Sequence, residues 1–272
     1  MINFDGKFHA TLLDEKILAS TSMYKQKILA IIQVGENPSS EKYIYVKQAA
    51  CEKLGVVSRL YRILPKRGSG YNELVDLLKT LGTEELVSSI IVQLPLPDSS
   101  MYSSLDLLPL AKDIDFLSTE KKALAFNDSI DSFEIKSPVI RALEYYLGSN
   151  SITPENAPQV GIIGQGDLVG KPCFDYLSFR KFSVKVIDHY AQGDPLNFDL
   201  LISSTGVPKL INPKDIKAGC HVVDFGSAVL NGKTVGDLNT DLDLTHLGVV
   251  SKSPGGMGPL VVRFLIMNHL RI

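Results

Sequence analysis

Short apolar segments alternate with helical segments along the whole chain, and this alternation constrains the fold more than any other feature of the sequence. In the first half, apolar runs of strand length occupy residues 27–34, 57–64 and 88–94. The segments between them have the apolar spacing and the end residues of helices. A regular exchange of strand and helix is typical of α/β proteins, whose parallel sheets are covered by helices.

The ends of two helices can be placed from single residues. Asn37 and Pro38 supply an N-cap side chain and a first-turn proline, and Gly55 is expected to end the helix that they begin. A second helix is predicted over residues 71–81, with Gly82 as its stop. Each helix can then return the chain to the start of the next parallel strand.

The second half of the chain repeats the alternation. Ser137 and Pro138 predict the start of a helix that ends at Gly148. The last predicted helix follows the glycine-rich segment 254–259 and could pack on either half. Helical or turn segments separate four runs of strand character, the pattern of a Rossmann-like sheet. These runs are residues 160–163, 183–188, 199–203 and 221–224.

Composition excludes several classes of protein. Lys plus Arg number 28 and Asp plus Glu number 30, a net charge of −2, which argues against a nucleic acid or an anionic membrane as partner. Cys51, Cys173 and Cys220 have no metal-ligand spacing, so we expect no metal site and a reducing compartment. Residues 1–16 contain no signal-peptide core, and no apolar run approaches the ~18 residues of a membrane span. We therefore expect a soluble, cytoplasmic protein.

One helix carries three polar side chains on the face that should point inward. At about 100° per residue, Ser40, Tyr43 and Lys47 share a stripe with Cys51 and Leu54. Burial lowers the pKa of a lysine, which suits it to proton transfer near neutral pH. Alternatively, Lys47 extends its stem past a core tyrosine to reach solvent. The helix alone does not decide between these interpretations.

Gln93 lies where a buried strand gives way to the proline-rich segment 95–97. Open α/β sheets bind ligands at the carboxyl ends of their strands. A glutamine there can accept a hydrogen bond from an ammonium group and donate one to a substrate carbonyl at the same time. The alternative is a glutamine that only ends the strand.

Asp113 and Asp115 flank one apolar residue, so in an extended segment both side chains would point to the same side. One of them could accept hydrogen bonds from an amino-substituted heterocycle. Solvated loop carboxylates are the commoner explanation of such a pair.

A glycine-rich turn joins the first strand of the second half to a helix. Gly164 and Gly166 allow a pyrophosphate to approach the helix N-terminus, although the third glycine, Gly170, comes one place later than in the usual fingerprint. Asp188 ends the next strand, close to the acidic position roughly 20 residues on that binds the ribose hydroxyl of NAD. A carboxylate there would repel the extra phosphate of NADP, but it can also be an ordinary turn residue.

Together these segments resemble the bifunctional methylenetetrahydrofolate dehydrogenase/cyclohydrolase family over nearly the whole chain. Residues 34–55 are similar to its first signature, with the serine, tyrosine and lysine at Ser40, Tyr43 and Lys47. The segments 92–97, 112–115 and 254–259 resemble its Val-Gln-Leu-Pro-Leu-Pro, Lys-Asp-Val-Asp-Gly and Pro-Gly-Gly-Val-Gly-Pro signatures.

The resemblance implies two α/β domains with a folate cleft between them. The first would span residues 1–136, joined by the returning helix 257–272, and the NAD(P)-binding domain would span residues 137–256. The implied reactions are oxidation of 5,10-methylenetetrahydrofolate to 5,10-methenyltetrahydrofolate with NAD(P)⁺ and hydrolysis of that product to 10-formyltetrahydrofolate. A homodimer and a role in one-carbon metabolism and purine biosynthesis are also implied.

The resemblance further implies roles for single residues. Lys47 would be the catalytic lysine and Gln93 its orienting partner, with Tyr43 stacked on the substrate, Ser40 supporting the site and Asp115 holding the pterin. Lys47, Gln93, Tyr43 and Asp115 form the implied catalytic set. Pro254, Gly255 and Gly256 would line the folate cleft. The implied cofactor-binding residues are Gly164, Gln165, Gly166, Val169, Gly170, Asp188, Thr205 and Gly206.

Departures from the family pattern bear on the cofactor and on the cleft. Gln165 stands where the family turn has an arginine that could meet a 2′-phosphate, and Asp188 stands where the family often has cysteine, so we expect NAD to be favoured over NADP. Phe116 replaces the glycine after Asp115. These changes leave two alternatives: a folate- or nucleotide-binding paralogue without turnover or with a single activity, and a different small-molecule dehydrogenase on the same scaffold.

Overall fold

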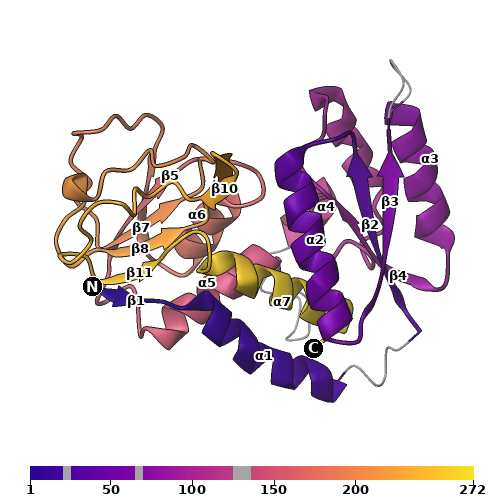
Figure 1. The fold of residues 1–272 in the computed structure, drawn as a ribbon, viewed down its shortest axis with the longest axis horizontal. Helices are drawn as coiled ribbons and strands as arrows, with labels where there is room; N and C mark the ends of the chain where they lie inside the picture. The colour runs from indigo at the N-terminus through magenta and orange to yellow at the C-terminus, as the bar shows by residue number, and fades with distance from the viewer. Residues whose placement is uncertain (21–25, 65–69, 125–135) are drawn as a thin grey trace. The chain divides into compact units, whose positions relative to one another are not determined.

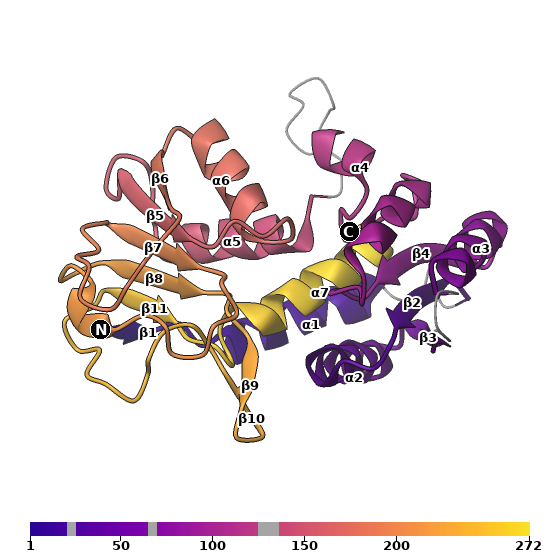
Figure 2. The ribbon, with the colours of Figure 1, turned by 90° about the horizontal axis from the view of Figure 1, so that it is seen from above.

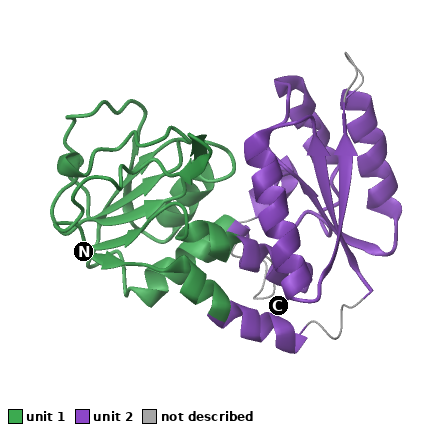
Figure 3. Cartoon of the chain, viewed as in Figure 1, with its two compact units in different colours: residues 1–11, 139–261 green, residues 12–138, 262–272 purple. Residues whose placement is uncertain are grey.

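The computed structural model describes residues 1–20, 26–64, 70–124 and 136–272 (Figure 1). The chain forms two compact units (Figure 3). Unit 1 consists of residues 1–11 and 139–261, and unit 2 of residues 12–138 and 262–272. Each unit is an α/β structure with a parallel sheet, which confirms the predicted fold class. Among the described residues, no helix has the length and apolar character needed to cross a bilayer.

Unit 2 contains a three-stranded parallel sheet with the order β3-β2-β4. The central strand β2 (Ile28–Val34) is buried along its whole length, between β3 (Val57–Ile63) and β4 (Val87–Val92). Helix α2 (Pro38–Lys53) connects β2 to β3, and α3 (Gly70–Thr83) connects β3 to β4. Because the two connections run in opposite directions across the sheet and right-handed crossovers are the rule, α2 and α3 cover opposite faces (Figure 2). This unit also contains η2 (Ser99–Leu107) and α4 (Thr119–Leu124).

Helix α2 begins as the sequence predicts, but two helices continue past their expected stops. The Asn37 side chain accepts hydrogen bonds of 3.0 Å from the backbone N–H groups of Ser39 and Ser40. The predicted stop at Gly82 was wrong, because α3 runs on to Thr83, and Gly148 likewise lies inside α5 (Pro138–Ser149). A glycine weakens a helix by about 1 kcal/mol, which packing of the neighbouring turns can offset.

Unit 1 contains a six-stranded parallel sheet with the order β1-β11-β8-β7-β5-β6. The four strands predicted from the sequence, β5 to β8, form one continuous part of this sheet. Helix α6 (Gly170–Phe179) connects β5 to β6, and β9 (Ala228–Leu230) and β10 (Lys233–Val235) form an antiparallel hairpin. The sheet strands are β1 (Ile2–Asn3), β5 (Gln159–Ile163), β6 (Ser183–Ile187), β7 (Leu200–Ser203), β8 (His221–Asp224) and β11 (Val249–Ser251).

The division into units differs from the expected domain boundaries at both ends of the chain. We expected residues 1–136 together in the first domain, whereas β1 pairs with β11 and residues 1–11 therefore belong to unit 1. Helices α1 (Gly6–Ser20) and α7 (Met257–His269) each contribute residues to both units. A strand of two residues has no periodicity from which its pairing could be predicted.

A buried carboxylate joins three helices within unit 2. Asp14 of α1 is 3% exposed and accepts two hydrogen bonds from Arg263 of α7, at 2.8 and 3.1 Å, and one from Lys53 of α2, at 2.9 Å. Burial opposes ionisation of this carboxyl, but the hydrogen bonds from Arg263 and Lys53 outweigh it and lower the pKa of Asp14. The ionised form therefore stabilises the folded unit.

Replacing Asp14 with Asn is expected to destabilise the protein by about 3 kcal/mol at neutral pH, because it leaves a guanidinium group without its carboxylate. The contribution of Asp14 is present above the ordinary aspartate pKa of about 3.9 and is lost as the pH falls through the lower folded-state value. Denaturant unfolding of both proteins between pH 7 and pH 3 should show the difference shrinking with acid. Glu41→Gln, which breaks an exposed pair with Arg62, is the control and should cost less than about 1 kcal/mol. An equal loss in both variants would contradict this account.

Candidate active site

The sheet of unit 2 has a topological switch point, at which the chain continues first on one side of the central strand and then on the other. The chain passes from β2 to β3 on one side and then to β4 on the other, so the switch lies between β2 and β4. In open α/β sheets, ligands bind beyond the carboxyl ends of the strands at such a switch point. Gln93 follows β4 directly at this edge, as predicted.

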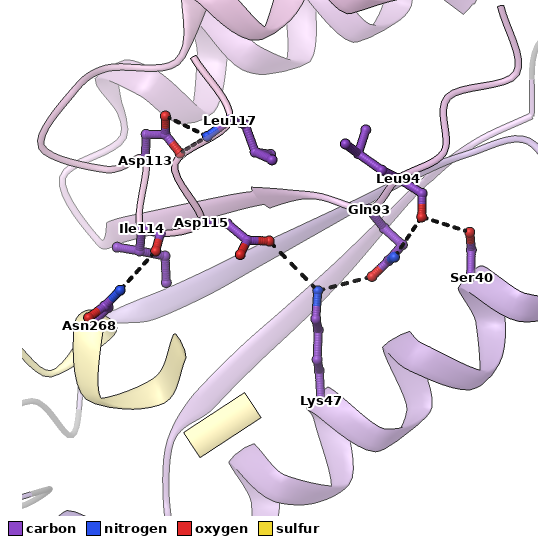
Figure 4. A network of polar contacts seen from close by, with 9 residues as sticks. All are labelled: Ser40, Lys47, Gln93, Leu94, Asp113, Ile114, Asp115, Leu117 and Asn268. Atoms are coloured by element: carbon purple, nitrogen blue, oxygen red, sulfur yellow. Dashed lines mark hydrogen bonds and ion pairs between the residues drawn. The ribbon is translucent and has the colours of Figure 1, made fainter. Parts of the chain in front are cut away.

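Lys47 and Gln93 meet at this edge (Figure 4). The Lys47 Nζ atom donates a hydrogen bond of 3.0 Å to Oε1 of Gln93 and lies 4.0 Å from Oδ2 of Asp115. The Lys47 side chain is only 9% exposed. The structure thus contradicts the alternative in which Lys47 extends into solvent, and it gives Gln93 a partner beyond the end of the strand.

The carbonyl oxygen of Leu94 fixes the orientation of the Gln93 amide. It accepts a hydrogen bond of 2.8 Å from Nε2 of Gln93 and one of 3.3 Å from Oγ of Ser40 (Figure 4). Because Nε2 is held by this carbonyl, Oε1 of the same amide faces Lys47. Ser40 therefore supports the site by holding the residue next to Gln93.

Asp113 and Asp115 do not share one side, as an extended segment would have required. Asp113 is 1% exposed and accepts hydrogen bonds from the backbone of Leu117 and from the backbone and hydroxyl of Ser118, whereas Asp115 points toward Lys47 (Figure 4). The segment turns between the two residues, so that Asp113 organises the loop and Asp115 faces the site. Asp113 is also no solvated loop acid.

Asn268 of α7 holds the same loop from the other side. Its Nδ2 donates a hydrogen bond of 3.0 Å to the carbonyl of Ile114 (Figure 4). It donates a second one, of 2.8 Å, to the carbonyl of Lys136. Ile114 stands between the two aspartates, so Asn268 fixes the backbone from which Asp115 projects. Asn268 was not predicted, because nothing in the sequence indicates a contact across so many residues.

Burial dominates the electrostatics of the Lys47–Asp115 pair. Loss of hydration lowers the pKa of Lys47, against the smaller opposing effect of the Asp115 charge. Loss of hydration likewise raises the pKa of Asp115 to about 6, with the Lys47 charge lowering it and the Asp113 charge raising it. Both shifts bring the two groups closer to the pH range in which enzymes transfer protons.

Tyr43, a predicted site residue, and Phe116, a departure from the family pattern, belong to the same two segments as Lys47 and Asp115. Tyr43 lies one turn before Lys47 on α2 and is half-buried. Phe116 has a φ of +59°, in the left-handed region that favours glycine, and it is 6% exposed. The chain therefore keeps the backbone turn of a glycine at this position although the residue is a phenylalanine.

In unit 1, the predicted cofactor segments meet at one edge of the sheet. Ile163 of β5 is in register with both Ile187 of β6 and Ser203 of β7. Gly164 and Asp188 therefore follow neighbouring strands, and Thr205 and Gly206 come just after the third. The switch point of this sheet lies between β5 and β7, where such folds bind nucleotides.

The glycine turn fits a dinucleotide. Gly164 has a φ of +95°, and a Cβ on Gly170 would lie only 1.9 Å from the Gly164 carbonyl oxygen, so both must be glycine. A Cβ on Gly166 would enter open space, and Val169, the N-cap of α6, makes no side-chain cap hydrogen bond. A pyrophosphate can bind at a helix N-terminus that has no capping side chain.

The other predicted residues of unit 1 lie as follows. Gln165 and Asp188 are exposed, and the backbone N–H of Thr205 donates a 2.6 Å hydrogen bond to Asp237, which the sequence analysis missed. Pro254 and Gly255 line a pocket of about 240 Å³, and Gly256 follows them at the start of α7. All of these residues belong to unit 1, whereas the Lys47 cluster belongs to unit 2.

Comparison with known proteins identifies the family of the chain. Residues 4–115 match the family model described as the tetrahydrofolate dehydrogenase/cyclohydrolase catalytic domain, and residues 144–272 match the NAD(P)-binding domain of the same family. The chain belongs to this family. The bifunctional protein FolD of Aquifex aeolicus is 34% identical over 98% of this chain and 93% of its own length.

Solved structures share the fold. That of the bifunctional dehydrogenase/cyclohydrolase FolD from Campylobacter jejuni has a TM-score of 0.87 at 29% identity and covers 99% of this chain and 97% of its own. The Trypanosoma brucei enzyme, whose structure contains NADP and an inhibitor, has a TM-score of 0.87 at 22% identity and covers 99% and 96%. The family resemblance drawn from the motifs is thus confirmed.

Two substitutions should move the pKa of Asp115 in opposite directions. Lys47→Met removes the positive charge that lowers it, so the pKa should rise above the value of about 6. Asp113→Asn removes a negative charge that raises it, so the pKa should fall. Carboxyl ¹³C NMR titration of the folded proteins measures both shifts, with Glu41→Gln as a control that should leave Asp115 unchanged. A shift of the same sign in both variants would refute the assigned electrostatics.

Proposed function

We propose that Lys47, with Gln93 and Asp115 as its partners, carries out the proton transfers of a bifunctional folate enzyme. As a member of its family, the chain is a methylenetetrahydrofolate dehydrogenase and a methenyltetrahydrofolate cyclohydrolase. The observation that carries the assignment of residues is the buried Lys47 ammonium, held 3.0 Å from the Gln93 amide at the switch point of unit 2.

The oxidation requires positioning more than acid or base chemistry. A bound nicotinamide supplies the hydride acceptor for the methylene bridge of the substrate. The residues that would hold the dinucleotide are those of the glycine turn and the segments that follow β6 and β7. On the folate side, the ionised Asp115 can accept hydrogen bonds from the amino groups of a pterin, and Tyr43 offers an aromatic face one turn from Lys47.

The hydrolysis requires a group that exchanges protons near neutral pH. Water adds to the methenyl carbon, and opening of the ring then gives 10-formyltetrahydrofolate. Because burial lowers the pKa of Lys47, its amine can take a proton from water and return it without a large free-energy penalty. Gln93 orients this amine through its accepted hydrogen bond. The same five residues, Ser40, Tyr43, Lys47, Gln93 and Asp115, would have no reason to occur together in a paralogue without turnover.

Lys47→Met is expected to abolish cyclohydrolase turnover and to reduce dehydrogenase activity strongly, while the protein still folds. Steady-state assays with methylenetetrahydrofolate and with methenyltetrahydrofolate measure the two activities separately. Lys42→Met, at an exposed position of the same helix, is the matched control and should keep both. Cyclohydrolase rates like those of the unmodified protein in the Lys47 variant would show that the role assigned to Lys47 is wrong.

We further propose that this enzyme prefers NAD to NADP. The turn after β5 carries Gln165 in place of a cation, and Asp188 places an exposed carboxylate after the neighbouring strand. A carboxylate can accept hydrogen bonds from both ribose hydroxyls of NAD but repels a 2′-phosphate. The lack of a positive charge at Gln165 and the negative charge of Asp188 both favour NAD over NADP.

The double variant Asp188→Ser with Gln165→Arg should raise the ratio of kcat/KM for NADP to that for NAD by at least about tenfold, since it replaces a repulsion with an attraction. Asp188→Asn, which removes only the charge, should give a smaller change in the same direction. The cyclohydrolase rate, which uses no nicotinamide, is the internal control. An unchanged ratio would refute the preference assigned from these two side chains.

The family resemblance also supports a homodimer, a cytoplasmic location and a contribution of one-carbon units to purine biosynthesis. These remain proposals, and the first is open to a direct test. Sedimentation equilibrium at micromolar concentration should give twice the 29.8 kDa mass of the chain.

A further inference from the structure

Gln33 is a buried polar residue without a partner, in the strand at the centre of unit 2. It is 2% exposed, and neither Nε2 nor Oε1 has a hydrogen-bond partner among the described residues. An amide withdrawn from water without compensation is unfavourable, so a glutamine at such a position requires an explanation. The residues beside Gln33 on the neighbouring strands suggest an explanation.

The register of the sheet places Gln33 between two polar side chains. Gln33 pairs with Arg62 of β3, and on the other side Ile32 pairs with Val92, so that Gln93 comes next to Gln33. The backbone N–H of Gln93 donates to the carbonyl of Ile32 at 2.8 Å, which continues the pairing. Side by side residues of parallel strands lie about 4.8 Å apart and point to the same face of the sheet.

The outer two members of this row, Arg62–Gln33–Gln93, bind helix α2. Arg62 donates to Glu41 at 3.0 Å, and Gln93 accepts from Lys47 at 3.0 Å. The row therefore lies on the sheet face that α2 covers, and its central member, Gln33, lies on the same face. This position is also the switch point between β2 and β4, where the Lys47 site lies.

We propose that Gln33 binds an internal water molecule that also accepts a hydrogen bond from Lys47, which makes Gln33 a positioning residue for the hydrolysis. Water suits this position chemically, because both buried amide atoms of Gln33 need a partner, and water can donate to Oε1 while accepting from Nε2 or from an ammonium group. The inference rests on the proposed role of Lys47. Lys47 would then have two amide neighbours, Gln93 by a direct hydrogen bond and Gln33 through the water molecule.

The water would affect the hydrolysis more than the oxidation. In the hydrolysis, a bond forms between a water oxygen and the methenyl carbon, and one proton passes to the Lys47 amine. The second proton reaches N5 as the bond between N5 and this carbon breaks, so one water is consumed and one proton is released. The internal water stabilises the charged form of Lys47 and so opposes the effect of burial on its pKa. Hydride transfer requires no such exchange.

The test replaces Gln33 with Met, an apolar residue of similar shape, and compares both activities across pH. The cyclohydrolase kcat should fall about tenfold, the magnitude of one lost hydrogen bond, while the dehydrogenase kcat changes less than about twofold. The limb of the cyclohydrolase pH profile that Lys47 sets should move to lower pH by about one unit. A crystal structure of the unmodified protein should show one water between the Gln33 amide and Lys47 Nζ, absent in the variant.

A purely structural role for Gln33 predicts the opposite result. Removing two unpartnered polar atoms would raise Tm and leave the activity ratio and the pH profile unchanged, and this outcome would overturn the proposal. Arg62→Gln, at the exposed end of the same row, is the matched control and should leave both activities and the profile intact. If the unmodified protein has no cyclohydrolase activity, or Lys47→Met retains it, the proposed function fails instead. Activity that is lost in Lys47→Met but unaltered in Gln33→Met rejects only the role of Gln33.

Discussion

The unfavourable burial of the Lys47 ammonium is the constraint on which the rest of unit 2 depends. Withdrawing such a charge from water is opposed by several kcal/mol, which partners must offset with good geometry. Gln93 supplies one partner at 3.0 Å and Asp115 a weaker one at 4.0 Å. The surrounding contacts hold these two partners of Lys47 in position. Ser40 and the Leu94 carbonyl orient the amide, and Asn268 holds the loop that carries Asp115.

The two units use the same topological rule but different chemistry. In each sheet the chain passes from one strand to its neighbour on one side and then to a strand on the other side, and the predicted residues gather at the carboxyl edge of that switch point. Unit 2 places charged and amide side chains there, which suits proton transfer. Unit 1 places a glycine turn and a helix N-terminus there, which suits a phosphate-containing ligand. The division of labour between a catalytic and an NAD(P)-binding domain follows from these two edges.

Local patterns in the sequence predict the parts of the site that local structure determines. Asn37 and Pro38 fix the start of α2, and the spacing of Ser40 and Lys47 then decides which face carries them. The strand end places Gln93. Contacts between distant segments leave no such pattern: Asn268 reaches Ile114 from the opposite end of the chain, and β1 pairs with β11. The predicted orientation of Asp113 was wrong for the same reason. The hydrogen bonds that Asp113 accepts from Leu117 and Ser118 turn the loop, and the sequence pattern does not indicate them.

The departures from the family pattern separate into changes of backbone and changes of charge. Phe116 adopts the left-handed conformation that a glycine would adopt, so the loop that carries Asp115 keeps its turn at some conformational strain. In unit 1, the close approach of Gly170 to the Gly164 carbonyl fixes the turn independently of the exposed Gln165 side chain. Substitutions at Gln165 and Asp188 can therefore alter the charge at the proposed ribose position without altering the turn proposed to bind the pyrophosphate. Cofactor preference in this scaffold is thus free to change while binding of the dinucleotide is retained.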